Sequence, residues 1–216
     1  KMLSKYSDDI DATFYMNKPH RPPNSGVNYI AYQDVIKKNI SGKIYDQIWH
    51  FATYGQPAKF MNSWKEIIDL NVSDLNYLVD LLKNDGNLFY ASSSEIYGDK
   101  KSDESTIPSS DPLSKRAIYT ESKRLGEAFL NMSLGKQTTI LRICLAYSPN
   151  FIIGDNRVLY ELIVKGLTNN KINLIDDGSS ERQYIFIDDA IEMMENIAFK
   201  EREYNFSNHG VWNISN

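Results

Sequence analysis

The sequence predicts an α/β protein in which helices cover both faces of a parallel sheet, with a small C-terminal cap. Short runs rich in β-branched and aromatic residues alternate with longer amphipathic runs, which is typical of strand–helix–strand units. The chain has 216 residues, of which 42% are hydrophobic, and this is enough apolar material for a sizeable core. We expect a doubly wound sheet in residues 1–149 and a cap region in residues 150–216.

Five runs are predicted to be the strands of the sheet, because each is short, apolar and rich in residues that favour extended backbone. They are residues 11–17, 27–33, 46–53, 87–94 and 138–147.

Two long helices are predicted between and after these strands. In residues 63–86, leucine and isoleucine recur at helical spacing, and Gly86 is expected to end the helix. The second helix is predicted over residues 119–135, ending at Gly135.

The cap is predicted to contain a helix over residues 157–167 and a short strand over residues 171–176. A final strand and helix follow in residues 182–199, with Asp188 or Asp189 expected to cap the helix.

Composition argues against several classes of partner. The 24 basic and 28 acidic residues are scattered, so no basic stripe is present to neutralise the phosphates of a nucleic acid. No apolar stretch approaches the roughly 20 residues that a membrane span needs, and the first ten residues lack the apolar core of a secretion signal. We therefore expect a cytoplasmic protein that binds neither nucleic acid nor membrane.

The cysteine and histidine residues do not suggest a metal site. The single cysteine, Cys144, lies in an apolar run and is expected to be a buried, inert thiol, which favours a reducing compartment. The three histidines are widely dispersed, and His50 is expected to pack in the core.

Small, hydroxylated or aromatic residues follow three of the predicted strands, in "HFATYGQ", "ASSSEIYG" and "LAYSPN". Loops after strands are often polar for conformational reasons alone. The carboxyl ends of parallel strands nevertheless meet at one edge of a sheet, where ligands bind in this class of fold. Three such endings together favour a binding site.

Tyr119 and Lys123 are four residues apart on a predicted helix, so their side chains share one face. The ammonium of Lys123 is expected to lower the pKa of Tyr119 and make the phenol usable as an acid or base near neutral pH. Taken alone, the pair is also explained as a surface contact worth about 0.2–0.5 kcal/mol. Its position shortly after the serine-rich strand end favours the functional interpretation.

Seven segments, taken in order, resemble the extended short-chain dehydrogenase/reductase superfamily. They are "HFATYGQP", "LNVSDLNYL", "ASSSEIYG", "YTESKRLGE", "LRICLAYSPN", "GSSERQYIFIDDA" and "VWNISN". Within this superfamily the chain is most similar to NAD-dependent sugar-nucleotide epimerases, dehydratases and decarboxylases. The resemblance covers nearly the whole chain and implies a Rossmann-like fold, a nucleotide-sugar substrate and NAD as the cofactor.

The resemblance also implies roles for four catalytic residues. Tyr119 would take a proton from a sugar hydroxyl, and Lys123 would hold the nicotinamide ribose. Ser93 would hydrogen-bond the reacting oxygen, and Glu95 would serve the acid/base steps after oxidation. Serines at this place could instead cap the turn by bonding backbone amides.

Ser94 bears on the type of reaction. Dehydratases that act on dTDP-glucose carry an aspartate at this position, whereas UDP-glucuronate decarboxylases and GDP-mannose dehydratases share the order of hydroxyl, serine and glutamate. Glu95 weighs against simple epimerisation. The alternative is a non-catalytic relative that keeps the fold for nucleotide binding.

The resemblance assigns the remaining site residues by position. Ser94 and Arg182 would contact the substrate, the latter at its diphosphate, and Asn71 would support the site. Besides Tyr119 and Lys123, the cofactor is expected to contact Asp34, Val35, Phe51, Ala52, Thr53 and Ala91. NADP is not excluded, because Asn17, Lys18 and Arg21 could tolerate a 2′-phosphate. A homodimer is expected through the helices of "LNVSDLNYL" and "YTESKRLGE".

Two departures from the family pattern stand out. The chain contains no G-x-x-G-x-x-G turn of the kind that holds a dinucleotide pyrophosphate. We therefore expect both domains to be incomplete, as in a fragment trimmed at both ends. The family's usual asparagine, glycine and arginine are replaced by Leu145, Ser148 and Asn150, which implies an altered substrate or an inactive relative.

Overall fold

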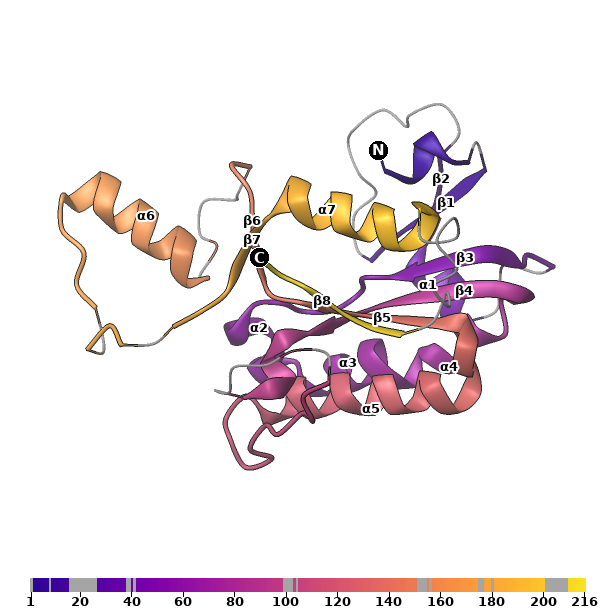
Figure 1. The fold of residues 1–216 in the computed structure, drawn as a ribbon, viewed down its shortest axis with the longest axis horizontal. Helices are drawn as coiled ribbons and strands as arrows, with labels where there is room; N and C mark the ends of the chain where they lie inside the picture. Colours follow the sequence, from indigo (N-terminus) through magenta and orange to yellow (C-terminus); the bar gives the residue numbers. More distant parts are fainter. Residues whose placement is uncertain are drawn as a thin grey trace.

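A computed structural model gives the fold of the chain (Figure 1). It describes residues 2–7, 9–15, 27–37, 40, 42–98, 103, 105–150, 155, 157–174, 177–179, 181–200 and 210–216.

The described strands form three parallel groups. β1 (Ile10–Phe14) pairs with β2 (Val27–Ala31), and β6 (Leu145–Tyr147) pairs with β7 (Tyr184–Phe186). The central sheet has the order β3-β4-β5-β8. Its strands are β3 (Tyr45–His50), β4 (Leu82–Ser93), β5 (Thr138–Ile143) and β8 (Gly210–Ile214).

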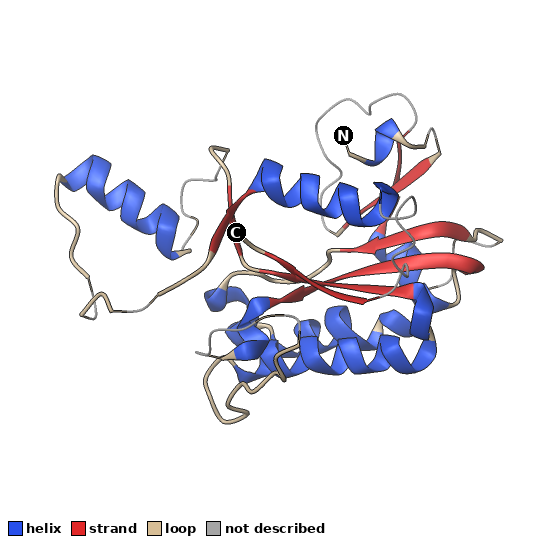
Figure 2. Cartoon of the chain, in the orientation of Figure 1, coloured by secondary structure: helices blue, strands red, loops and turns tan. Residues whose placement is uncertain are grey.

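Helices cover the central sheet on two sides (Figures 1 and 2). On one side lie α3 (Trp64–Ile68), the π-helical turn η2 (Asp69–Ser73), α4 (Leu75–Val79) and α5 (Ala117–Ser133). On the other side lie α7 (Ile187–Glu195) and the π-helical turn η5 (Asn196–Lys200). The shorter elements are η1 (Leu3–Lys5), α1 (Tyr32–Ile36), α2 (Pro57–Asn62), η3 (Ser94–Tyr97) and η4 (Gly135–Gln137). The cap helix α6 (Val158–Asn169) projects to one side of the sheet (Figure 1).

The core has two layers because side chains of the central strands alternate between the two faces. Leu88 and Tyr90 pack with Leu130 on the side of α4 and α5. Phe89 packs with Met194 on the side of α7. The predicted α/β fold with a parallel sheet and helices on both faces is therefore confirmed.

The predicted helix over residues 63–86 is wrong after Val79. The helix runs through α3, η2 and α4 and ends at Val79, while Gly86 lies inside β4. Tyr45 donates its N–H to the carbonyl of Leu81, and Leu82 pairs with Tyr45. Leucines at these positions fit a helix or a strand equally well, and pairing with β3 decides for the strand.

Several strand boundaries also differ from prediction. β1 ends at Phe14, so that Tyr15 lies outside it, and Ser94 belongs to η3 instead of β4. Tyr32 and Gln33 begin α1 instead of extending β2, and β3 ends at His50. The run 138–147 divides at Cys144, because its N–H bonds to Ile214 of β8 whereas Leu145 bonds to Gln183 beside β7. The chain therefore leaves the central sheet for a second one.

In the cap, the strand predicted over residues 171–176 is absent from residues 171–174, and residues 175–176 lie outside the described part. Helix α7 begins at Ile187 after Phe186, so that Asp188 and Asp189 fall in its first turn and neither caps it. Carboxylates in a first turn still interact favourably with the helix dipole. The helix predicted over residues 157–167 is confirmed as α6.

None of the helices in the described part of the chain is both long and apolar enough to cross a bilayer.

Candidate active site

The end of β4 and the start of α5 bring together three of the predicted catalytic residues. Ser93 is the last residue of β4, and its hydroxyl oxygen accepts the N–H of Glu95 at 3.3 Å. This bond starts the short turn η3, which holds Glu95 next to the strand end. A hydrogen bond joins Ser93 to Tyr119, and the charge of Glu95 also acts on that phenol. Ser93 thus both caps the turn and touches the predicted base.

Tyr119 is buried, and its pKa is raised to about 12, mainly by burial. The hydrogen bond to Ser93 and the charge of Arg116 oppose this rise, while Glu95 adds to it. The expectation that Lys123 lowers the pKa of Tyr119 is therefore wrong for this state of the protein. The phenol keeps its proton at neutral pH.

Lys123 lies one turn after Tyr119 on the sheet-facing side of α5 and is 1% exposed. Its Nζ donates to the carbonyl of Ala91 at 2.6 Å and lies 4.7 Å from the centroid of the Tyr90 ring. Burial lowers the pKa of Lys123 to about 7, against the charge of Glu127, which raises it. The amine is thus held at the end of β4, and Lys123 is not among the groups that shift the pKa of Tyr119.

The charges of two guanidinium groups act on Glu95. Arg116 Nη2 donates to Glu95 Oε1 at 2.5 Å, and the charge of Arg182 also favours the ionised carboxylate. Burial outweighs both effects and raises the pKa of Glu95. A rise in the pKa of a carboxyl group is the direction that an acid/base residue requires.

Asn71 lies at the π-helical turn η2 and is fully buried against α5. Its amide donates to Ser122 Oγ at 2.9 Å, and its backbone carbonyl accepts the Tyr90 hydroxyl at 3.0 Å. α5 comes close here because Gly126 has no side chain: a methyl group would lie 2.4 Å from the Tyr90 hydroxyl. The π-helical turn η2 thus fixes the position of α5, the helix that carries Tyr119 and Lys123.

A buried ion pair supports the other face of the strand end. Arg142 of β5 donates from Nη2 to Glu127 Oε2 at 2.7 Å and from Nη1 to the Tyr97 hydroxyl at 2.7 Å. Ser92 donates to Glu127, and Tyr97 donates to Asn213 of β8. This network joins β4, β5, β8, η3 and α5 directly behind Ser93.

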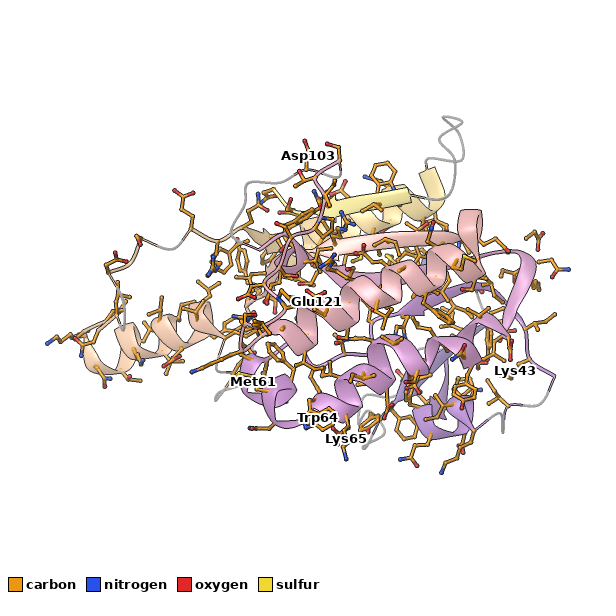
Figure 3. All side chains as sticks on the ribbon, turned by 90° about the horizontal axis from the view of Figure 1, so that it is seen from below. Lys43, Met61, Trp64, Lys65, Asp103 and Glu121 are labelled. Atoms are coloured by element: carbon orange, nitrogen blue, oxygen red, sulfur yellow. The ribbon has the colours of Figure 1, made fainter. Side chains whose placement is uncertain are left out.

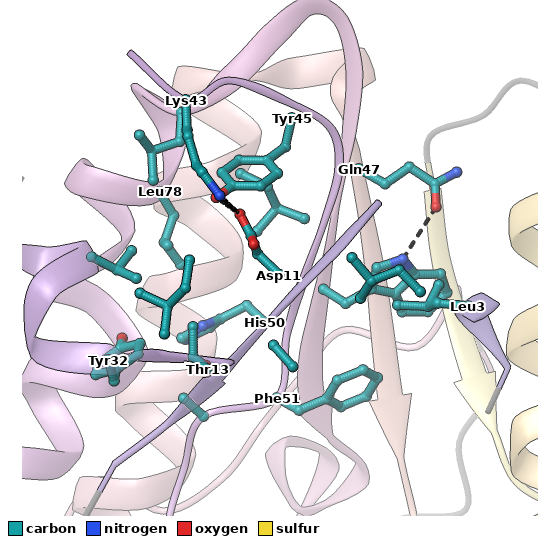
Figure 4. Close-up of a pocket in the computed structure, with 18 of the residues that line it drawn as sticks. Leu3, Asp11, Thr13, Tyr32, Lys43, Tyr45, Gln47, His50, Phe51 and Leu78 are labelled. Atoms are coloured by element: carbon teal, nitrogen blue, oxygen red, sulfur yellow. Dashed lines mark hydrogen bonds and ion pairs between the residues drawn. The ribbon is translucent and has the colours of Figure 1, made fainter. Parts of the chain in front are cut away.

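A pocket of about 1080 Å³ opens between β1 and β3 (Figure 4). Four residues predicted to contact the cofactor line it: Val35, Phe51, Ala52 and Thr53. The Thr53 hydroxyl is buried and has no hydrogen-bond partner among the described residues. The small Ala52, just after the end of a parallel strand, and the unpaired Thr53 hydroxyl fit contact with a dinucleotide.

His50 also lines this pocket but is nearly fully buried, as expected for a packed histidine. Its Nε2 lies 2.7 Å from the carbonyl of Leu70, and burial, the largest effect, lowers its pKa to about 4. Cys144 is likewise buried, and burial raises the pKa of its thiol to about 11. No group of three potential metal ligands occurs within the described ranges.

The other predicted residues are more scattered. Asp34 is exposed on α1, Ser94 is half-buried in η3, and Arg182 is exposed just before β7. Ala91 is buried beside Lys123. Asn17, Lys18 and Arg21 lie outside the described residues.

Leu145, Ser148 and Asn150 lie in and after β6, at the start of the cap. The N–H of Ser148 donates to the Tyr160 hydroxyl at 2.9 Å, so a residue of α6 fixes this loop.

Sequence reasoning missed Arg116 and Phe60. The Phe60 ring stacks on Tyr119 at 4.8 Å between centroids, and the Arg116 guanidinium lies 5.5 Å from the Phe60 centroid. Arg116 precedes Tyr119 by three residues, a helical spacing that could have suggested their proximity. Nothing in the sequence pattern links Phe60 to α5.

The chain matches a known protein family and several curated relatives. Residues 28–214 match the model of the NAD dependent epimerase/dehydratase family. The chain is 27% identical over 154 residues to UDP-glucuronic acid decarboxylase 1 of Xenopus tropicalis, covering 68% of this chain and 36% of the relative. It is 27% identical over 178 residues to UDP-glucuronic acid decarboxylase 4 of Arabidopsis thaliana, covering 78% and 40%. The chain thus spans less than half the length of these curated relatives.

Solved structures share the fold. The chain is similar to the UDP-glucose 4-epimerase of Thermotoga maritima with UDP-glucose, with a TM-score of 0.76, 16% identity and coverage of 99% of this chain and 71% of that one. It is also similar to the UDP-glucuronic acid 4-epimerase of Bacillus cereus in complex with UDP-glucuronic acid and NAD. There the TM-score is 0.68 with 23% identity, covering 89% of this chain and 61% of that one.

Proposed function

Because the chain belongs to the NAD-dependent epimerase/dehydratase family, we propose that it forms part of an enzyme that modifies a nucleotide sugar through transient oxidation at C4. The observation that carries this proposal is the convergence of Ser93, Glu95 and Tyr119 at the end of β4. The fourth predicted residue, Lys123, lies one turn further along the same helix.

Tyr119 is the proposed base for the sugar hydroxyl, and Ser93 orients the oxygen that reacts. With a pKa of about 12, Tyr119 begins as a phenol, so it must first release its own proton to solvent before it can accept the proton of the sugar hydroxyl. Lys123 would hold the ribose of the cofactor by turning its Nζ from the Ala91 carbonyl. Glu95, with its raised pKa, would move protons on the oxidised sugar.

NAD, when bound, supplies the hydride acceptor for the oxidation. Val35, Phe51, Ala52 and Thr53 would hold it in the pocket beside β3. Asp34 would contact its adenine side, and Ala91 would lie next to it at the end of β4. NADP remains an alternative cofactor, because Asn17, Lys18 and Arg21 could accept a 2′-phosphate.

Among the reactions of the family, we propose decarboxylation of UDP-glucuronate as the first to test. Curated relatives that match the chain include UDP-glucuronic acid decarboxylases, and Ser94 stands where dTDP-glucose dehydratases carry an aspartate. Arg182 would grip the substrate diphosphate, and Ser94 would contact the sugar.

The proposal is tested by mass spectrometry of products after the full-length protein is incubated with NAD and a panel of UDP-, GDP-, dTDP- and CDP-sugars. Loss of carbon dioxide identifies a decarboxylase, loss of water a dehydratase, and an isomer of equal mass an epimerase. If every substrate is recovered unchanged while NAD is bound, the protein is a non-catalytic relative.

Tyr119→Phe tests the assignment of the base. We expect turnover to fall by about 10²–10⁴-fold, as for loss of a general acid or base, while NAD still binds. Tyr77→Phe on α4 is the matched control and should keep full turnover. Equal turnover in Tyr119→Phe and the wild type would remove Tyr119 from the mechanism.

We also propose a reducing compartment such as the cytoplasm, on the strength of one buried cysteine and the absence of other thiols in the sequence.

A further inference from the structure

We propose that Arg116 is a specificity-determining residue that binds a carboxylate on the sugar ring, so that the site selects uronate sugars over neutral hexoses. This inference rests on the proposed function and adds to it a residue and a substrate class.

Arg116 is held next to both predicted acid/base groups. Its Nη2 donates to Glu95 Oε1 at 2.5 Å. Its guanidinium lies over the Phe60 ring, which in turn stacks on Tyr119. A carboxylate on one side and an aromatic face on the other fix the cation close to Tyr119.

The guanidinium is also open to an incoming ligand. The side chain of Arg116 is 45% exposed, and that of Glu95 is 28% exposed. A guanidinium carries five N–H donors in a planar fork that matches a carboxylate. The bond to Glu95 shows that the guanidinium already binds a carboxylate in this place. Lys123 is 1% exposed and is assigned above to the cofactor ribose, which leaves Arg116 for the sugar carboxylate.

The charge of Arg116 would distinguish the two kinds of sugar. Arg116 is partly exposed beside Glu95, so a carboxylate on the sugar would gain a cation as its partner there. A neutral hexose carries no charge at that place, and opposite charges in a partly buried site attract more strongly than in water.

The test compares two ligands that differ in charge at the sugar. Dissociation constants for UDP-glucuronate and UDP-glucose are measured by calorimetry on the full-length protein loaded with NAD. In Arg116→Met, we expect binding of UDP-glucuronate to weaken by about 10–100-fold, as for loss of a hydrogen bond to a charged group. Binding of UDP-glucose should change less than about threefold. Arg116→Lys keeps the charge without the planar guanidinium, so its dissociation constant for UDP-glucuronate should lie between those of the wild type and Arg116→Met.

The control is Arg124→Met, on the same helix, whose guanidinium pairs with Glu121 at 3.1 Å and not with Glu95. It should leave both dissociation constants unchanged. Thermal unfolding of each variant shows whether it folds. If Arg116→Met does not fold, the two dissociation constants are compared in Arg116→Lys instead.

Equal weakening of both ligands in Arg116→Met would overturn the inference, because the cation would then serve the diphosphate that the two ligands share. Unchanged binding of UDP-glucuronate would also overturn it. If the wild-type protein binds neither nucleotide sugar, the proposed function itself fails, which is a different result from a wild type that binds both without help from Arg116.

Discussion

Lys123 links the stability of the fold to pH. Its folded pKa of about 7 lies below the ordinary value of 10.5, so the unfolded chain binds more protons between these pH values. The free energy of unfolding therefore rises with pH across this window, by up to about 1.4 kcal/mol per pH unit for one proton. Above about pH 9, the raised pKa of Cys144 acts in the opposite direction.

We predict that the free energy of unfolding rises from pH 7 to about pH 8.5 in the wild type and rises less in Lys123→Met. Urea denaturation at the two pH values measures both slopes. Equal slopes in the two proteins would show that the amine is not buried as described.

The positions of the proposed catalytic residues could be predicted from the sequence, but their contacts and pKa values could not. The spacing of Tyr119 and Lys123 placed both on one face of α5, and "SSSEIYG" located the strand end that meets them. The direction of the Tyr119 pKa could not be predicted, because it depends on burial and on where Lys123 Nζ points. Arg116 was missed because it meets Glu95 only through the fold of the loop between them.

At the scale of elements, α5 packs on the central sheet through a glycine. A methyl group at Gly126 would lie 2.4 Å from the Tyr90 hydroxyl and 2.6 Å from the Asn71 carbonyl oxygen. We predict that Gly126→Ala lowers the free energy of unfolding by about 1–3 kcal/mol, as overpacking does. Gly166→Ala on α6 is the control, since its nearest neighbour is Ile172 Cδ1 at 3.4 Å. Better helix propensity should make that variant up to about 1 kcal/mol more stable.

The ion pair of Glu127 and Arg142 joins α5 to β5. Both side chains are largely buried, at 13% and 7% exposure, so removal of one partner leaves an uncompensated charge. We predict that Arg142→Met costs about 3–5 kcal/mol in chemical denaturation. Arg124→Met, which removes an exposed partner of Glu121, should cost about 0–1 kcal/mol. Similar costs for the two variants would mean that the Arg142 network is not a structural support.

The elements themselves were predictable where periodicity was unambiguous. α5 and the strands β3, β4 and β5 of the central sheet follow from their apolar patterns, whereas β8 was not predicted. The end of α4 could not be predicted from the sequence. Leu81 and Leu82 fit the apolar period of a helix and that of a strand, and the pairing with Tyr45 decides for the strand. The run 171–174 has the composition of a strand but no neighbouring edge in the described part of the chain to pair with.

At the scale of the whole molecule, we propose that the chain forms a homodimer through the outer side of α3, α4 and α5. Large apolar side chains are exposed there, among them Trp64, Leu125 and Met132. Figure 3 shows Met61 and Trp64 on α2 and α3 near Glu121 on α5. We predict that the wild type sediments as a dimer and that Leu125→Asp sediments as a monomer. Leu113→Asp, in the exposed loop before α5, should remain dimeric. A monomeric wild type would contradict the proposal.

The strand order of the central sheet affects how the nascent chain folds during translation. β5 lies between β4 and β8, and Thr139 of β5 pairs with Gly210 of β8. During translation, β5 therefore remains an open edge until residues 210–214 have left the ribosome, and distant parallel pairing of this kind is slow. Asn213, which accepts the Tyr97 hydroxyl behind the active site, arrives with that strand. An arrested nascent chain that ends before residue 210 would thus carry every predicted catalytic side chain and still depend on chaperones to shield β5.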